Sequence, residues 1–231
     1  MNIAIVGATG NVGRKIIEVL ENKNFPISEL YLIASSKSSG QKINFKGKEH
    51  TVIDLEKFEF SKVKIAFFAA GSAVAEKWAH KVAEKTIVID NSKYFRKDSE
   101  IPLIVPEVNS KELVHVKNKN IIANANCSVI PLVVALKPLH DLYTVKRIVA
   151  STYQSVSGAG KAPMDELLSQ TQDYFNNKNL QSKHFTKQIA FNAIPHIDSF
   201  LENGYTKEEQ KTSDEVKKIL DKKIKITSTC V

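Results

Sequence analysis

The chain has 231 residues, 42% of them hydrophobic, which is enough for one large domain or two small ones around a real core. Its two cysteines exclude a disulfide framework, its N-terminus lacks a secretory signal, and no stretch reaches the roughly 20 apolar residues that cross a bilayer. We therefore expect a cytoplasmic protein without a membrane partner. The net charge of +8 comes almost entirely from lysines spread along the chain, which indicates a solvated surface and no nucleic-acid partner.

The first predicted strand, residues 3–6, passes into a glycine-rich turn and then into an amphipathic helix. The predicted apolar side of this helix consists of Val12, Ile16, Ile17 and Leu20. Strand, glycine turn and helix in this order are the context of a dinucleotide-binding motif, here with GxxGxxG spacing. The glycines would let the backbone approach a pyrophosphate at the helix N-terminus, while the alternative is a turn without a ligand. The candidate cofactor-binding residues are Gly7, Thr9, Gly10, Asn11, Val12 and Gly13.

The second predicted strand, residues 30–34, ends in a loop of serines and a lysine. A site that prefers NAD usually has an acidic residue here, which binds the ribose 2′-hydroxyl. Hydroxyl groups and an ammonium group suit a 2′-phosphate instead. We therefore expect NADP as the cofactor, bound with the help of Ser35, Lys37 and Ser38; the alternative is a polar turn whose serines bond only to the backbone.

Further strands are predicted at residues 63–69 and 86–90, with a helix from Ser72 to about Glu84 between them. The alternation of strands and helices indicates an α/β fold with a doubly wound, Rossmann-type parallel sheet. We assign residues 1–125 to an NADP-binding domain. In such sheets ligands bind beyond the carboxyl ends of the strands.

Cys127 lies between a strand that ends near Ala123 and a helix predicted over residues 129–142. A cysteine at or just before a helix N-terminus is favoured as a thiolate, because the unpaired N–H groups and the helix dipole stabilise an anion. The alternative is a buried core cysteine. Residues 70–72 and 91–92 also follow predicted strands, so they could line one crevice with Cys127.

The second part of the chain, residues 126–231, is predicted to be an α+β domain. It begins, after the helix that follows Cys127, with a strand over residues 147–153. The next helix is predicted over residues 163–175, with an inner side that consists of Leu167, Leu168 and Thr171. The last predicted helix starts after Thr206, which would form a capping box with Glu209.

Eight segments of the chain, taken in order, resemble the aspartate-semialdehyde dehydrogenase family. They are residues 7–13, 90–92, 95–98, 105–109, 125–128, 152–160, 191–195 and 215–220. The resemblance runs along essentially the whole chain and implies a homodimeric enzyme of lysine, threonine, methionine and diaminopimelate biosynthesis. The implied reaction is the NADPH-dependent reductive dephosphorylation of L-aspartyl-4-phosphate to L-aspartate 4-semialdehyde.

The same resemblance implies roles for the residues around the reacting carbon. Cys127 would attack the acyl carbon and form a thioester, which a thiolate does readily. Gln154 would orient the substrate beside the nucleophile, and Glu215 would pair with the substrate's amino group. No metal is implied.

Further roles concern the phosphate and the nicotinamide. Arg96, Asn126 and Lys218 resemble the residues that hold the phosphate, a role that suits a guanidinium group in particular. Ser157 and Gly158 resemble part of the nicotinamide pocket. The alternatives are a surface arginine at Arg96, an ordinary i, i+3 surface pair of Glu215 and Lys218, and an outward-facing strand residue at Gln154.

The family, by the same resemblance, continues past Val231 to a substrate-binding arginine and to the histidine that acts as the acid–base partner of the cysteine. None of the six histidines of this chain stands in a matching context. The resemblance therefore implies that residues 126–231 are an incomplete α+β catalytic and dimerisation domain, and we expect a C-terminally truncated enzyme with little or no activity. The alternatives are an inactive nucleotide-binding remnant and a related acyl-phosphate reductase of the N-acetylglutamyl-phosphate type.

Overall fold

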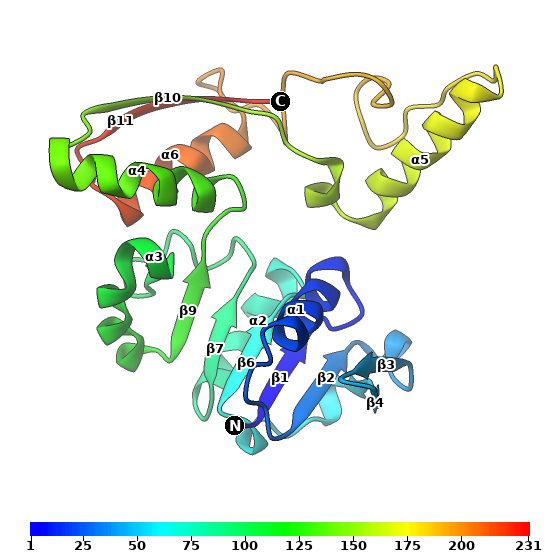
Figure 1. Cartoon of the computed structure of the whole chain (residues 1–231), viewed down its shortest axis with the longest axis vertical. Coiled ribbons are helices and arrows are strands. Elements are labelled where there is room, and N and C mark those ends of the chain that lie inside the picture. The colour runs from blue at the N-terminus through cyan, green and yellow to red at the C-terminus, as the bar shows by residue number, and fades with distance from the viewer. The chain divides into compact units, whose positions relative to one another are not determined.

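The structure is a computed structural model that describes residues 1–231, apart from the side chain of Asn118. The chain folds into two compact units (Figure 1). The first unit comprises Met1–Val134 and Lys218–Leu220, and the second comprises Ala135–Lys217 and Asp221–Val231.

The first unit is built on a seven-stranded sheet in which all neighbouring strands are parallel. In spatial order the strands are β5 (Ile53–Asp54), β2 (Leu30–Ala34), β1 (Ile3–Val6), β6 (Ile65–Phe68), β7 (Ile87–Asp90), β9 (Ile121–Asn124) and β8 (Leu103–Ile104). The chain runs outward from β1 to β2 and β5 and then returns to the other side of β1 at β6. The predicted doubly wound sheet is thus confirmed, and its strand order reverses between β1 and β6, the position where such sheets bind ligands.

The helices of this unit follow the strands as predicted, and a small hairpin adds to them. The helices are α1 (Asn11–Asn22), α2 (Ser72–Ala83), α3 (Pro106–Asn109), the start of α4 (Val129–Tyr143) and four 3₁₀ helices at Ser36–Ser38, Leu55–Lys57, Phe60–Lys62 and Ser110–Asn118. The sequence analysis did not predict the hairpin of β3 (Lys42–Phe45) and β4 (Lys48–Thr51). Its two-residue turn consists of Lys46 and Gly47, both with positive φ, as a type I′ hairpin turn requires.

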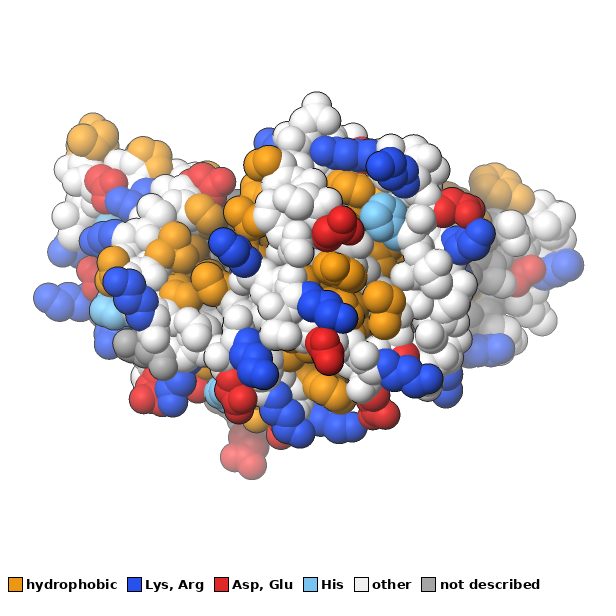
Figure 2. All heavy atoms as spheres, turned by 90° about the horizontal axis from the view of Figure 1, so that it is seen from below, with side chains coloured by type: hydrophobic (Ala, Val, Ile, Leu, Met, Phe, Trp, Pro, Cys, Tyr) orange, Lys and Arg blue, Asp and Glu red, His pale blue; other side chains and the backbone are white. Residues whose placement is uncertain are grey.

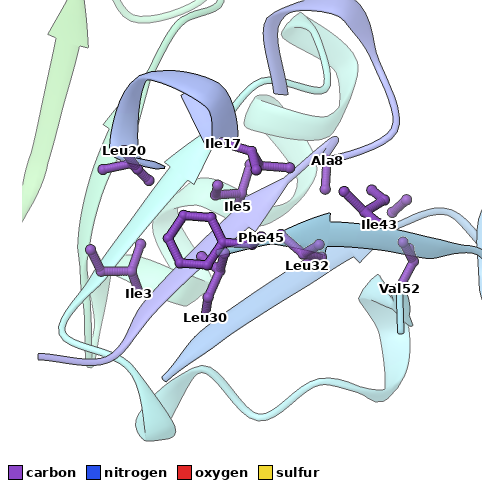
Figure 3. Packing of buried hydrophobic residues seen from close by; sticks show 11 residues of the cluster. Ile3, Ile5, Ala8, Ile17, Leu20, Leu30, Leu32, Ile43, Phe45 and Val52 are labelled. Carbon is purple, nitrogen blue, oxygen red and sulfur yellow. The ribbon is translucent and has the colours of Figure 1, made fainter. Parts of the chain in front are cut away.

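Helix α1 and the hairpin enclose a cluster of buried apolar side chains on one face of β1 and β2 (Figure 3). The cluster consists of Ile3, Ile5, Ala8, Ile17, Leu20, Leu30, Leu32, Ala34, Ile43, Phe45 and Val52. The assignment of Val12 to the apolar side of α1 is wrong, because its side chain is 50% exposed. Gly13 faces the preceding loop, and neighbouring helix residues are about 100° apart, so Val12 points away from the core.

The second unit contains a parallel pair of strands, β10 (Arg147–Thr152) and β11 (Lys225–Cys230). Its helices are α5 (Lys161–Phe175), the end of α4 and most of α6 (Lys207–Ile219). The predicted capping box of α6 is confirmed: the Thr206 N–H donates to Glu209 Oε2 (2.7 Å), and the Glu209 N–H donates to Thr206 Oγ1 (3.3 Å). Helix α6 therefore begins where its sequence signal places it.

Helix α5 buries polar side chains where an apolar side was predicted. Leu168 is 59% exposed, so its assignment to the inner side is wrong. The buried positions are Glu166 and Gln170. Glu166 Oε2 accepts hydrogen bonds from the backbone N–H groups of Lys183 (3.2 Å) and His184 (2.7 Å). The loop that packs on α5 presents backbone donors rather than apolar side chains, and buried donors need acceptors.

Lysine and acidic side chains are interspersed on the face of the molecule shown in Figure 2, with apolar side chains between them. None of the helices in the described part of the chain combines the length and the apolar character needed to cross a membrane.

Candidate active site

The turn between β1 and α1 is shaped by Gly7 and Gly13. Gly7 has a φ of +86°, and a Cβ there would lie 2.6 Å from the carbonyl oxygen of Ala69, at the end of β6. A Cβ on Gly13 would lie 2.2 Å from the carbonyl oxygen of Gly7. Both positions need glycine for close backbone packing. Gly10 is exposed, has a φ of −78°, and a Cβ there would meet only that same oxygen, at 3.4 Å. The missing Cβ of Gly10 therefore leaves space in front of the helix N-terminus, which a ligand can use.

The end of β2 lies beside this turn. The N–H groups of Gly7 and Ala8 both donate to the carbonyl oxygen of Ile33, at 2.8 and 3.1 Å. Ser35 and Lys37 are exposed in the segment that follows, and Ser38 is half-buried there. The structure thus brings together the two segments that the sequence analysis assigned to the cofactor. Of the remaining predicted contacts, Thr9 is half-buried, while Asn11 and Val12 are exposed in the first turn of α1.

Cys127 is an exposed free cysteine between β9 and α4. The buried side chain of Asn126 organises the backbone around it: Asn126 Oδ1 accepts hydrogen bonds from the N–H and the hydroxyl of Ser128, both at 2.9 Å. The thiol of Cys127 donates to the same oxygen at 3.6 Å. The carbonyl oxygen of Asn126 accepts from the N–H groups of Val129 and Ile130, which begin α4. The alternative of a buried core cysteine is therefore wrong, and the thiol lies at the start of the helix as predicted.

The neighbouring strand β7 ends in polar residues that are tied to β9. Asn124 Nδ2 donates to Asn91 Oδ1 (2.8 Å), and Arg96 Nη2 donates to the carbonyl oxygen of Asn91 (3.1 Å). Asp90 is fully buried beside them and accepts from both the N–H (3.1 Å) and the hydroxyl (2.6 Å) of Ser92. Burial raises the pKa of Asp90, although the Ser92 bonds and the charge of Arg96 oppose the shift. Hydrogen bonds thus join the ends of β7 and β9, while the crevice that residues 70–72 and Cys127 would share with them stays a prediction.

Lys218 contacts the segment that carries Arg96. Its Nζ donates to the backbone carbonyl oxygens of Arg96 (3.0 Å), Asp98 (2.6 Å) and Ile101 (2.9 Å). The structure brings these two predicted phosphate ligands together, but through the backbone of Arg96. A cavity of about 240 Å³ opens beside Lys218, and His115, Glu112 and Glu100 contribute to its lining.

The remaining predicted site residues belong to the second unit. Gln154 follows β10, and its Nε2 donates to Glu208 Oε1 (3.3 Å). Ser157 and Gly158 are exposed in a 3₁₀ helix (Val156–Ala159), where the N–H and the hydroxyl of Ser157 donate to Ser155 Oγ at 3.2 and 3.0 Å. Glu215 is buried on α6. The sequence analysis missed Glu208, because its only signal was its place beside Glu209 in the capping turn.

No group of three or more histidine, cysteine or carboxylate side chains in the described residues has the arrangement of a metal site. The predicted site residues themselves offer a thiol, amides, hydroxyls, a carboxylate and cations.

Comparison with known families places this geometry in a class. The family model described as semialdehyde dehydrogenase, NAD binding domain, matches residues 2–116. The model described as semialdehyde dehydrogenase, dimerisation domain, matches residues 136–231. The chain thus has the NAD-binding domain and the dimerisation domain of a semialdehyde dehydrogenase.

Individual proteins of known identity are similar to this chain over its whole length. The aspartate-semialdehyde dehydrogenase 2 of Vibrio cholerae is 50% identical over 232 residues, which cover 100% of this chain and 69% of the relative. The aspartate-semialdehyde dehydrogenase of Aquifex aeolicus is 51% identical over 233 residues, which cover 99% of this chain and 68% of the relative. A crystal structure of the Vibrio cholerae aspartate semialdehyde dehydrogenase II complexed with ASA superposes with a TM-score of 0.97 at 49% identity, covering 99% of this chain and 69% of that one. The chain belongs to the aspartate-semialdehyde dehydrogenase family.

Proposed function

We propose that this chain carries the nucleotide-binding and thiol chemistry of an NADPH-dependent reduction of L-aspartyl-4-phosphate to L-aspartate 4-semialdehyde and inorganic phosphate. The single observation that carries the proposal is the exposed Cys127, which the Asn126 turn holds at the start of α4, beyond the carboxyl end of β9. The Vibrio cholerae relative complexed with ASA supports the same substrate class.

The cofactor of the proposal is NADP, and the residues fit it. Gly10 leaves space at the N-terminus of α1, where N–H groups and the helix dipole suit a pyrophosphate. The exposed segment after β2 offers Ser35 and Lys37 and no carboxylate between residues 35 and 40, which suits a 2′-phosphate better than a bare 2′-hydroxyl. When bound, NADPH supplies the hydride of the reduction.

Cys127 is the proposed nucleophile. Its thiolate attacks the acyl carbon of the substrate, and the carbon–oxygen bond to the phosphate breaks, so that a thioester remains on the sulfur. After reduction of the carbonyl carbon, the carbon–sulfur bond breaks, the aldehyde is released and the thiolate is regenerated. An exposed thiol suits these steps, because the substrate has to reach the sulfur.

The phosphate of the substrate is proposed to bind Arg96, Asn126 and Lys218. A phosphate accepts hydrogen bonds, so Asn126 would have to donate to it through Nδ2. The Ser128 bonds to Asn126 Oδ1 favour this orientation, because they use the oxygen as an acceptor within the turn. Arg96 would supply the planar guanidinium fork that suits a phosphate.

The second part of the chain is proposed to orient the substrate. Gln154 would hold the acyl group, Glu215 would pair with the substrate's amino group, and Ser157 and Gly158 would border the nicotinamide. We assign residues 1–125 to the nucleotide-binding domain and residues 126–231 to a catalytic domain that forms a homodimer. The reaction needs Cys127 as a free thiol, which fits a cytoplasmic location.

The test is phosphate-dependent formation of NADPH from aspartate semialdehyde by the purified chain, followed by absorbance. Cys127→Ala should abolish turnover and leave NADPH binding unchanged. The matched control is Cys230→Ala, which removes a buried thiol of the second unit and should leave turnover unaffected. Turnover that persists in Cys127→Ala would exclude Cys127 as the nucleophile. A folded chain that binds NADPH without turnover would agree with the little or no activity expected from the sequence and would favour the inactive nucleotide-binding remnant.

A further inference from the structure

The side-chain amide of Gln154 is held from both ends within the second unit. Its Oε1 accepts a hydrogen bond from the hydroxyl of Thr152 (2.9 Å), and its Nε2 donates to Glu208 Oε1 (3.3 Å). The backbone of Gln154 is fixed as well, because its N–H donates to the carbonyl oxygen of Val231 (2.7 Å). Gln154 therefore lies at the end of the β10–β11 pair and is tied to the first turn of α6.

Glu208 is a buried carboxylate, with a side chain that is 9% exposed. Its second oxygen, Oε2, accepts from Lys211 Nζ at 3.0 Å, and the same ammonium group donates to Asp198 Oδ2 at 2.9 Å. Asp198 has a φ of +67°, and its Oδ1 accepts from the N–H of Ser199 (2.8 Å), which fixes the direction of the carboxylate. The second unit thus contains a continuous hydrogen-bond network that runs from Asp198 through Lys211 and Glu208 to Gln154.

The protonation of Lys211 and Glu208 depends on the groups that they contact. Burial lowers the pKa of Lys211, but its hydrogen bonds to Asp198 and Glu208 outweigh burial, and the net pKa is raised. Lys211 therefore stays protonated at neutral pH and provides a cation beside Glu208. The ammonium group 3.0 Å from Glu208 Oε2 favours the ionised carboxylate, because its charge offsets the loss of solvation.

An ionised carboxylate can only accept hydrogen bonds. The Glu208 carboxylate therefore excludes the flipped orientation of the Gln154 amide, in which Gln154 Oε1 would face Glu208 Oε1 and both atoms would be acceptors. The Thr152 hydroxyl completes the selection by donating to Oε1 on the other side. Thr152 and Glu208 thus both favour the orientation of the Gln154 amide in which Nε2 faces Glu208.

We propose that Glu208, held by Lys211 and Asp198, is a positioning residue that determines which way the amide of Gln154 faces. The inference rests on the proposed function, in which Gln154 orients the acyl group beside Cys127. An amide is useful there only in one orientation, because the flipped group would present a donor in place of an acceptor. Misplacement of a positioning group can cost on the order of 10²-fold in rate.

The first test is spectroscopic and does not depend on turnover. The side-chain amide resonances of Gln154 are assigned in the isotopically labelled chain from their loss in Gln154→Met. In Glu208→Gln the new amide has to offer its oxygen to Lys211, so it turns its NH₂ group towards Gln154. We expect both proton resonances of the Gln154 amide to shift. The matched control, Glu202→Gln, makes the same change at an exposed loop position of the same unit and should leave them unchanged.

Lys211→Met provides a second variant if Glu208→Gln does not fold. It keeps the carboxylate but removes its cation, and it should also shift the Gln154 amide resonances. Unchanged resonances in a folded Glu208→Gln or Lys211→Met variant would overturn the inference.

The second test is a double-mutant cycle on turnover. Glu208→Gln should lower kcat/KM by about 10- to 100-fold, and the double variant with Gln154→Met should be no worse than Gln154→Met alone. A double variant that loses a further tenfold would overturn the inference, because Glu208 would then act independently of Gln154. If the resonances shift but Gln154→Met leaves turnover intact, the proposed role of Gln154 fails while the contact with Glu208 stands.

Discussion

Alanine substitutions at Gly13 and Gly10 should separate the glycine that the fold needs from the glycine that the cofactor needs. A Cβ on Gly13 would lie 2.2 Å from the backbone oxygen of Gly7, and also 2.8 Å from Ala8 Cα. These are backbone atoms, so the turn itself has to move. A Cβ on Gly10 would meet nothing closer than 3.4 Å, at a φ of −78° that any residue can adopt.

The magnitudes follow from the two environments. Overpacking against backbone costs about 3 kcal/mol at the upper end, and the better helix propensity of alanine returns about 1 kcal/mol, so Gly13→Ala should cost about 2 kcal/mol. For a chain of this size that lowers Tm by about 4–8 °C. Gly10→Ala should change stability by less than about 0.5 kcal/mol, because the lost preference at the helix N-cap and the reduced entropy of the unfolded chain are of similar size.

The assay combines thermal unfolding with a fluorescence titration of NADPH. Gly10→Ala should weaken NADPH binding at least about tenfold, equivalent to about 1.4 kcal/mol, because the added methyl group occupies the space proposed for the pyrophosphate. Its unchanged Tm is the control that the fold is intact. Unaltered NADPH affinity in Gly10→Ala, or a Gly13→Ala variant as stable as the parent chain, would refute the reasoning.

Three further substitutions test contacts outside the glycine turn. Lys218→Met removes an ammonium group that donates to three carbonyls and should destabilise the chain by about 3 kcal/mol in urea unfolding, whereas a purely ligand-binding lysine would change stability little. Because the pKa of Asp90 is raised in the folded state, the protonated carboxyl contributes its full share to the free energy of unfolding below the unfolded-state pKa, and this share is lost as the pH rises through the folded-state pKa. In Asp90→Asn the free energy of unfolding, measured as a function of pH, should no longer show this loss. Glu166→Ala removes the acceptor of the Lys183 and His184 N–H groups, so it should lower the free energy of unfolding by about 2 kcal/mol and increase proteolysis between residues 181 and 190. Asp165 is exposed on the same helix, and Asp165→Ala should change neither the stability nor the proteolysis.

The elements that the sequence predicts best are those with local signals. The apolar runs of β1 and β2 are buried strands, and the Thr206–Glu209 capping box begins α6. These signals work because a parallel strand buried on both faces needs continuous apolar residues, and a helix N-terminus needs acceptors within its first turn. The hairpin of β3 and β4 has weaker signals, since β4 carries only polar side chains and its turn has lysine before glycine.

Helix orientation is predicted less well than helix position. Leu168 is exposed on α5 because the segment that packs there presents backbone N–H groups, and the sequence of a helix does not show what its neighbour offers. The same holds for Glu208 and Lys218, whose partners lie 54 residues and 117–122 residues away in the chain. The functional roles in the candidate site came from the resemblance to a family, because a single cysteine, arginine or glutamine has no local pattern that specifies its chemistry.

The contacts of Lys218 distinguish it from Arg96 as a phosphate ligand. A lysine ammonium group has three donors, and three backbone carbonyls accept from this one. Binding of a phosphate by Lys218 would therefore require it to leave at least one of these carbonyls, at a cost that offsets part of the attraction. Arg96 has five donors in a planar fork, and one of its Nη atoms is bound to the carbonyl oxygen of Asn91. Lys218 therefore fixes the backbone of residues 96–101 in addition to its proposed role as a phosphate ligand, and Arg96 offers the phosphate a guanidinium group carried by that segment.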